Sequence, residues 1–69
     1  MPRLPVVSSS IRSIGYQPED QLLEVEFAHG RVYQYFQVPS AAHQAFQQAD
    51  SKGVFFNSHI RGRFEYRSL

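Results

Sequence analysis

The sequence predicts an α+β domain, in which one or two short helices pack on the apolar face of an antiparallel sheet of three strands, with a fourth strand left open. Runs of β-branched and aromatic residues separated by turn sequences favour strands over residues 11–38. Apolar residues at helical spacing follow over residues 41–61. The length of 69 residues allows one domain only. We therefore expect residues 1–69 to form a single domain, with a core over about residues 7–64 and an N-terminal tail over residues 1–6.

Charged and apolar residues alternate in the second predicted strand, where Glu24 and Glu26 stand between three apolar residues. Such alternation is typical of a strand with one buried and one solvated face. The first strand is predicted over residues 11–17, the second over 23–27 and the third over 31–38. Across the first turn, the expected pairs are Ile14 with Val25 and Tyr16 with Leu23.

The second turn, around Gly30, decides which face each side chain of the third strand takes. A turn of two or four residues places Glu26 opposite Tyr33 and Glu24 opposite Tyr35. A three-residue loop would place the charges inside, and we reject it on that ground. The sequence therefore predicts that both tyrosines lie beside the glutamates on the solvated face. The buried face is expected to carry Leu23, Val25, Phe27, Val32, Phe36 and Val38.

Two helices are predicted after the sheet. The first covers about residues 41–50, with Ser40 as its N-cap and Gly53 as its C-cap. The second covers about residues 54–61, because Phe56 and Ile60 recur four residues apart. Residues 64–67 alternate again, so this segment is either simply extended or a fourth strand. The side chains expected where helices and sheet meet are Phe27, Phe36, Phe46, Phe56 and Ile60.

The charge is unevenly distributed along the chain. The formal net charge is only +1, which by itself does not indicate a nucleic-acid partner. Three arginines and five carboxylates give residues 1–51 a charge of −2, whereas four cations and one glutamate give residues 52–69 a charge of +3. We therefore look for an anionic partner at the C-terminal third. Its cations are Lys52, Arg61, Arg63 and Arg67.

These four cations are candidate phosphate ligands. Guanidinium groups bind phosphate oxygens in a bidentate manner, and arginine outnumbers lysine six to one in this chain. The alternative is that the arginines form ion pairs within the domain and are not available to a partner. The carboxylates considered for that alternative are Glu24, Glu26, Asp50 and Glu65.

Tyr33, Tyr35 and Asn57 are the other candidates for contacts with nucleic acid. Two tyrosines on one exposed sheet face could stack unpaired bases. The competing interpretation, favoured by the glutamates expected beside them, is that they cover the sheet or pack under the C-terminal segment. Asn57 could read a base edge, although an asparagine in this place more often bonds to local backbone groups.

The sequence offers little support for a metal site, a cofactor, catalysis or a membrane span. It contains no cysteine, and His29, His43 and His59 lack the spacing of paired metal ligands on a helix. It has no nucleophile elbow, phosphate-binding glycine loop or His-Glu-x-x-His motif, and a chain this short has little room for a pocket of about 300–1,000 Å³. Without a secretory leader or an apolar run of about 18 residues, we expect a soluble, cytoplasmic, non-enzymatic protein with no metal and no cofactor.

An ordered set of short motifs resembles the KTSC domain family, over about residues 7–63. The set consists of Ser8-Ser9-Ser10-Ile11, Ile14-Gly15-Tyr16, Phe27, Gly30, Tyr33-Gln34-Tyr35, Val38-Pro39, Ser51-Lys52-Gly53, Phe56-Asn57 and Ile60-Arg61. The family is named for its occurrence at the C-terminus of some lysyl-tRNA synthetases, and it also includes free-standing small bacterial proteins, which this chain resembles. That context implies RNA binding. It makes Arg61, which ends the last motif, the strongest single candidate for a contact with RNA.

The predicted function is that of a small binding module. We expect weak RNA binding through the basic C-terminal segment, with Arg61, Arg63 and Arg67 as phosphate contacts and the two tyrosines contributing if they are exposed. The alternative is a protein interaction module, as a homodimer or docked onto a larger protein through a sheet edge or the second helix. The two interpretations are separated by whether Tyr33, Tyr35 and Arg61 share one exposed surface.

Overall fold

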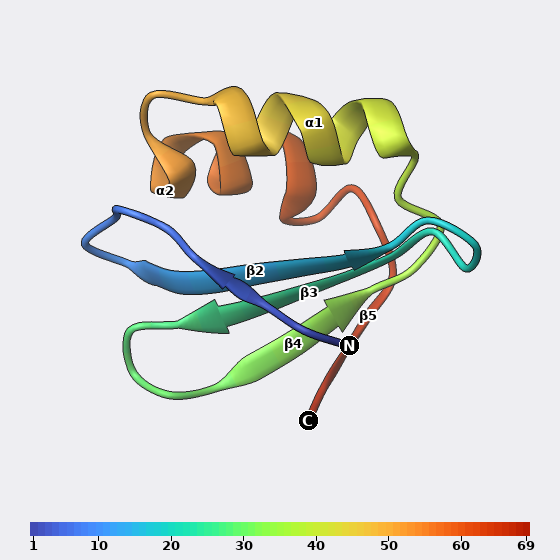
Figure 1. Cartoon of the computed structure of the whole chain (residues 1–69), viewed down its shortest axis with the longest axis horizontal. Helices are drawn as coiled ribbons and strands as arrows, with labels where there is room; N and C mark the ends of the chain where they lie inside the picture. Colours follow the sequence, from blue (N-terminus) through green and yellow to red (C-terminus); the bar gives the residue numbers. More distant parts are fainter.

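Five strands form one antiparallel sheet whose spatial order, β1-β2-β3-β4-β5, is also their order along the chain. The arrangement comes from a computed structural model that describes residues 1–69. Two helical segments lie on one face of this sheet, as Figure 1 shows. The strands are β1 (Leu4–Pro5), β2 (Ile11–Gln17), β3 (Leu22–Phe27), β4 (Val32–Tyr35) and β5 (Tyr66–Ser68). The helices are α1 (Ser40–Gln48), α2 (Lys52–Phe55) and the π-helical turn η1 (Phe56–Ile60), which continues α2 directly.

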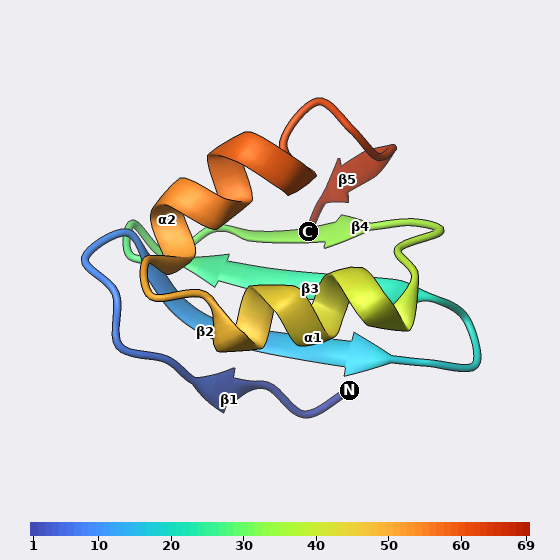
Figure 2. The same ribbon diagram turned by 90° about the horizontal axis from the view of Figure 1, so that it is seen from above.

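The α+β prediction is confirmed, and the sheet is wider than the three strands expected. β5 is the strand that the prediction left open. β1 lies within the predicted N-terminal tail, where Leu4 pairs with Ile14 and Pro5 with Ser13. Seen from above, β1 and β5 are the two edges, α1 lies over β2 and β3, and α2 lies nearer to β4 (Figure 2). None of the helices has the length and apolar character needed to cross a membrane.

The first hairpin has the register that the sequence predicts. Ile14 pairs with Val25, and Tyr16 pairs with Leu23. A β-bulge follows Ile11, and it separates the faces taken by Ile11 and Ser13. Ile11 is therefore buried in the core, whereas the Ser13 hydroxyl donates to Glu26 on the opposite face of the sheet.

The register predicted for the second hairpin is wrong by one residue. Glu24 lies opposite Gln34, and Val25 lies opposite Tyr33. The connection is the three-residue loop that the sequence analysis rejects, residues 28–30. Its ends are closed because the Phe27 amide donates to the carbonyl of Arg31 over 2.9 Å. Gly30 adopts a φ of +98°, a conformation that favours glycine.

The physical reason for the difference lies in β4 and not in the glutamates. Leu23 and Val25 face the core in either register, so the charges of β3 remain on the other face. The one-residue change in register instead brings Tyr33 and Tyr35 to the helical face of the sheet, where Tyr35 is buried and only 3% exposed. Phe36, expected in the core, lies on the opposite face with the Arg67 guanidinium 5.9 Å from its ring centre.

Both helices begin earlier than predicted, and their caps differ. α1 begins at Ser40 itself, so Ser40 is not its N-cap, and the α1 C-cap is Ala49. Gly53 lies inside α2, whose N-cap is Ser51, with its hydroxyl accepting from the Val54 amide over 3.3 Å. A Cβ at residue 53 would stand 2.6 Å from the Ser10 hydroxyl oxygen, which explains a glycine inside a helix here. The close approach places the start of α2 against the loop before β2.

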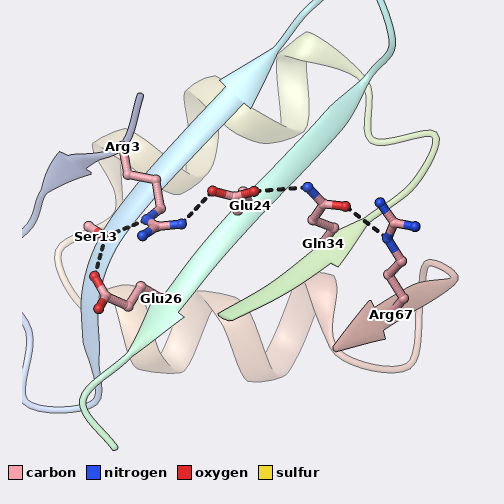
Figure 3. Close-up of polar contacts among 6 residues, drawn as sticks. All are labelled: Arg3, Ser13, Glu24, Glu26, Gln34 and Arg67. Atoms are coloured by element: carbon pink, nitrogen blue, oxygen red, sulfur yellow. Dashed lines mark hydrogen bonds and ion pairs between the residues drawn. The ribbon is translucent and has the colours of Figure 1, made fainter. Parts of the chain in front are cut away.

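The core lies between the helices and the sheet, and Phe46, Phe56 and Ile60 supply its helical side. On the opposite face, a chain of polar side chains crosses the sheet from β1 to β5 (Figure 3). Arg3 forms an ion pair with Glu24. The Gln34 amide donates to Glu24 over 2.9 Å, and Arg67 donates to the Gln34 carbonyl over 3.0 Å. This chain holds Glu24, only 6% exposed, between an arginine and an amide. We name Arg3, Glu24, Gln34 and Arg67 the polar chain.

Candidate functional site

A cleft of about 360 Å³ opens on the helical side of the sheet, beside η1 and the ends of β4 and β5. The volume lies at the low end of the range for small-molecule sites, so the expectation that a chain this short has little room for a pocket is wrong. One wall is aromatic, and η1 supplies polar groups. We name it the aromatic cleft, and its principal residues are Phe27, Tyr33, Tyr35, Phe56, Asn57, Arg61 and Tyr66.

Three tyrosine rings lie side by side in the cleft. Tyr33 and Tyr66 stack with ring centres 5.5 Å apart and planes 10° from parallel. The centres of Tyr35 and Tyr66 are 5.6 Å apart, and those of Tyr33 and Tyr35 are 6.5 Å apart. The sheet register causes this grouping, because Tyr66 lies opposite Tyr35 across the β4–β5 pair. We name Tyr33, Tyr35 and Tyr66 the tyrosine cluster.

The hydroxyl groups of the tyrosine cluster form no hydrogen bond within the protein. Of the four tyrosines in the chain, only Tyr16 has a bonded hydroxyl, which donates to the carbonyl of Val38. No polar side-chain atom is both fully buried and unbonded. The Tyr35 hydroxyl, the polar end of a residue with 3% exposure, therefore reaches the cleft.

The pKa of the Tyr35 hydroxyl is shifted by burial and by neighbouring groups. Burial is the main cause that raises this pKa to about 12, and the nearby Tyr33 and Tyr66 raise it further. The Arg61 guanidinium is close enough to act in the opposite direction. Arg61 and the three tyrosines line the same cleft. At neutral pH the Tyr35 hydroxyl stays protonated and can donate a hydrogen bond.

The π-helical turn η1 positions the two polar side chains that come from the helices. The Arg61 amide donates to the carbonyl of Phe56, five residues earlier, over 2.9 Å. Phe56 and Ile60 point into the core, whereas Asn57 and Arg61 are exposed and line the cleft. Single π-helical turns of this kind occur frequently at functional sites.

The structure brings together four of the seven residues predicted to bind nucleic acid. Arg61, Asn57, Tyr33 and Tyr35 all line the aromatic cleft. Tyr35 offers no ring face for stacking, because its ring is buried. The shared exposed face expected for Tyr33, Tyr35 and the glutamates is therefore wrong.

The other three predicted residues lie elsewhere. Arg67 belongs to the polar chain on the opposite face of the sheet. Lys52 donates to the carbonyl of Ala49 over 2.6 Å, at the end of α1. Arg63 is exposed beyond Gly62 and is not part of the aromatic cleft. The four cations of the basic segment thus lie in four different places.

None of the carboxylates considered as partners for the C-terminal arginines forms an ion pair with one of them. Glu24 pairs with Arg3 and Glu26 with Arg12, and these are the only two ion pairs in the structure. Arg61 therefore has no acidic partner within the chain. An exposed, unpaired guanidinium at the rim of an aromatic cleft can bind an anion.

Sequence reasoning missed Tyr66, Phe27, Ser10 and His29 as lining residues. Alternation over residues 64–67 was the one signal for Tyr66, since a strand there places alternate side chains on one face. His29 stacks on Phe27 with ring centres 5.6 Å apart, and its Nδ1 accepts from the Arg31 amide. No cluster of three or more histidine, aspartate or glutamate side chains suited to a metal ion is present.

Comparisons with known proteins identify the family of this chain. The model of the KTSC domain matches residues 7–64. An uncharacterized protein of Stutzerimonas stutzeri is 53% identical over 57 residues, which cover 83% of this chain and 80% of that protein. A crystal structure of a KTSC domain protein from Yersinia pestis superposes with a TM-score of 0.94 at 49% identity, covering 99% of this chain and 96% of that one.

A longer relative is the lysine–tRNA ligase of a Nostoc strain. It is 38% identical over 68 residues, which cover 99% of this chain but only 12% of the ligase. This chain thus corresponds to one small part of that enzyme. The match to the family model, together with these relatives, establishes that the chain belongs to the KTSC domain family.

Proposed function

We propose that this protein is a non-catalytic binding module for single-stranded RNA, and that the aromatic cleft is its binding site. The observation that carries the proposal is the convergence of the unpaired Arg61 guanidinium and the Asn57 amide on a cleft with an aromatic wall. Single-stranded RNA is recognised by stacking of bases on aromatic rings, and its phosphates bind arginine. The cleft combines these two kinds of group within a few residues.

Stacking is assigned to Tyr66 and Tyr33 and not to Tyr35. Tyr66 is 59% exposed, and its ring is stacked on the half-buried Tyr33. A base that stacks on the exposed side of this pair would lie beside Arg61. Asn57, four residues before Arg61 on η1, offers an amide donor and acceptor for a base edge. This arrangement favours an unpaired base, since a duplex keeps its base faces covered.

The relatives support an RNA ligand by context. A segment that matches nearly all of this chain occurs in lysine–tRNA ligases, enzymes whose name states that they act on tRNA. For this chain, the context agrees with the chemistry of the cleft.

The test is titration of a short fluorescent single-stranded RNA, followed by anisotropy at several salt concentrations. We expect Arg61→Ala to weaken binding about tenfold or more, because a hydrogen bond to a charged group contributes about 1.5–3 kcal/mol. It should also lower the slope of log K against log salt by about 1, since one phosphate contact is lost.

Arg67→Ala is the matched control, because it removes the same charge from the opposite face of the sheet. Circular dichroism establishes that both variants are folded. Equal losses in the two variants would show that net charge and not the cleft drives binding. If the wild-type protein binds no RNA at low salt, the proposal is wrong, and the alternative is a protein partner, for which the outer edge of β5 is an available strand.

A further inference from the structure

The tyrosine cluster contains more hydrogen-bond donors than stacking requires. Base stacking uses ring faces, yet three hydroxyl groups of this cluster are without a partner in the protein, and their residues line the same cleft as Arg61. One of them, on Tyr35, belongs to a residue that is 97% buried, given its 3% exposure. No side-chain polar atom is both fully buried and unbonded, so this hydroxyl reaches the cleft and is available to a ligand there.

The donors suit an oxyanion with several acceptor oxygens. The Arg61 guanidinium carries a positive charge and five N–H donors, and each tyrosine hydroxyl can donate one hydrogen bond. The cleft has no acidic side chain among its lining residues, so nothing there repels an anion. A phosphate group offers enough acceptor oxygens to engage an arginine and more than one hydroxyl together.

The depth of Tyr35 distinguishes a terminal phosphate from an internal one. An internal phosphodiester carries a sugar on each side, and both would have to enter the cleft before the phosphate reached a hydroxyl with so little exposure. A terminal phosphate monoester has one substituent only and can enter end-on. It also carries a charge of about −1.5 to −2 at pH 7, against −1 for a diester, which strengthens its bonds to Arg61.

Resting on the proposed function, we infer that the aromatic cleft binds the phosphate monoester at the end of an RNA strand, held by Arg61 and the hydroxyls of Tyr33, Tyr35 and Tyr66. The terminal base then stacks at the rim on the exposed face of Tyr66. The protein thereby recognises RNA ends and not the interior of a strand. Its substrate class is the product of RNA cleavage that leaves a phosphate on the end.

The experiment compares oligonucleotides of one sequence that differ only at their ends. A hydroxyl-ended strand, a 5′-phosphorylated strand and a 3′-phosphorylated strand are titrated by anisotropy at one fixed salt concentration. We expect one phosphorylated strand to bind about tenfold or more tightly than the hydroxyl-ended strand. A nucleoside monophosphate that carries its phosphate at the same position, 5′ or 3′, as the preferred strand should compete for the site. Inorganic phosphate should also compete, at higher concentration.

Tyr35→Phe isolates the buried hydroxyl, because it keeps the ring that packs in the core and removes only the unbonded oxygen. We expect this variant to lose the advantage of the phosphorylated strand and to bind the hydroxyl-ended strand as the wild type does. Tyr66→Phe, at an exposed residue, should act in the same direction without affecting the core. Tyr16→Phe is the matched control, since it deletes a tyrosine hydroxyl outside the cleft.

Each outcome distinguishes the inference from the proposed function. Equal binding of all three strands, unchanged by Tyr35→Phe, would overturn the inference and leave RNA binding in place. A peptide with a phosphorylated side chain that binds as tightly as the phosphorylated strand would also overturn the assignment to RNA ends. Both the inference and the proposed function are supported if the wild type prefers one phosphorylated strand and Arg61→Ala loses binding to every strand.

Discussion

Tyr35 serves two parts of the molecule. Its ring packs edge-on against Phe56, with centres 5.6 Å apart, and belongs to the core. Its hydroxyl faces the cleft without a protein partner. The ring thus contributes to stability and the oxygen to the proposed binding, so removing the one oxygen atom separates the two. Few side chains offer so clean a separation.

The hydroxyl of Tyr35 also predicts how stability changes at alkaline pH. Its pKa is raised from 10.0 in the unfolded chain to about 12 in the folded protein, mainly by burial. The stabilisation linked to this group is fully present below pH 10 and is lost as the pH rises towards 12. We expect the free energy of unfolding, measured by urea denaturation across this range, to fall more steeply for the wild type than for Tyr35→Phe. Parallel curves for the two proteins would contradict the raised pKa.

At the scale of the elements, the sequence predicts β2, β3 and the first hairpin closely. Alternation of apolar and charged residues defines β3, and pairing across residues 18–21 follows from it. The second hairpin was predicted wrongly because β4 has apolar or aromatic residues on both faces. With Val32 and Phe36 on one face and Tyr33 and Tyr35 on the other, either face suits the core. In the structure, the edge-on contact of Tyr35 with Phe56 of η1 favours the observed register.

The sequence predicts only part of the candidate site, because the register of β4 also decides which residues meet there. Arg61 and Asn57 were identified from a motif, and the two tyrosines from their spacing. Their meeting in one cleft depends on the register of β4 and on the π-helical turn, neither of which leaves a pattern in one sequence. Tyr66 was missed because β5 has only three residues. Alternation along β5 places Arg67 on the other face of the sheet from Tyr66, so it does not line the cleft.

The edge strand β1 depends on a glycine in its neighbour. A Cβ at Gly15 would lie 2.8 Å from the carbonyl oxygen of Pro2 and 3.0 Å from Cγ of Arg3. We expect Gly15→Ala to push residues 1–5 off the sheet and to lower the free energy of unfolding by about 1–3 kcal/mol, as overpacking does. Urea denaturation measures the loss. In a chain that lacks residues 1–3 the same substitution should cost much less, and an equal cost in both backgrounds would contradict the contact.

For the whole molecule, the polar chain connects the segment at β1 with β3, β4 and β5 by side-chain contacts. Arg3 also connects β2, because it donates to Ser13 over 3.2 Å. Both edge strands are short, so backbone hydrogen bonds alone hold them weakly. The arginines at either end of the polar chain anchor the two edges to the central Glu24 and Gln34. The face away from the cleft thus anchors the edge strands, and the helical face carries the candidate site.

Removing one end of the polar chain tests this division. Arg3→Ala leaves the nearly buried Glu24 with the neutral Gln34 amide as its partner, and we expect a loss of about 1–3 kcal/mol in the free energy of unfolding. Arg12→Ala is the matched control, because its ion pair with Glu26 spans 3.5 Å and is more exposed, and its loss should stay below about 1 kcal/mol. Both are measured by urea denaturation. A smaller loss for Arg3→Ala than for Arg12→Ala would contradict the role of the polar chain.

The number of residues between Phe56 and Arg61 indicates whether another family member has the π-helical turn η1. Its bond from Arg61 to Phe56 encloses one residue more than an α-helical bond does. A relative with a one-residue gap between these positions would have a regular helix there, with the amide after the gap bonded to the carbonyl four residues earlier. Such a gap would mark a protein that retains the fold but lacks the π-helical turn, whatever the rest of its sequence resembles.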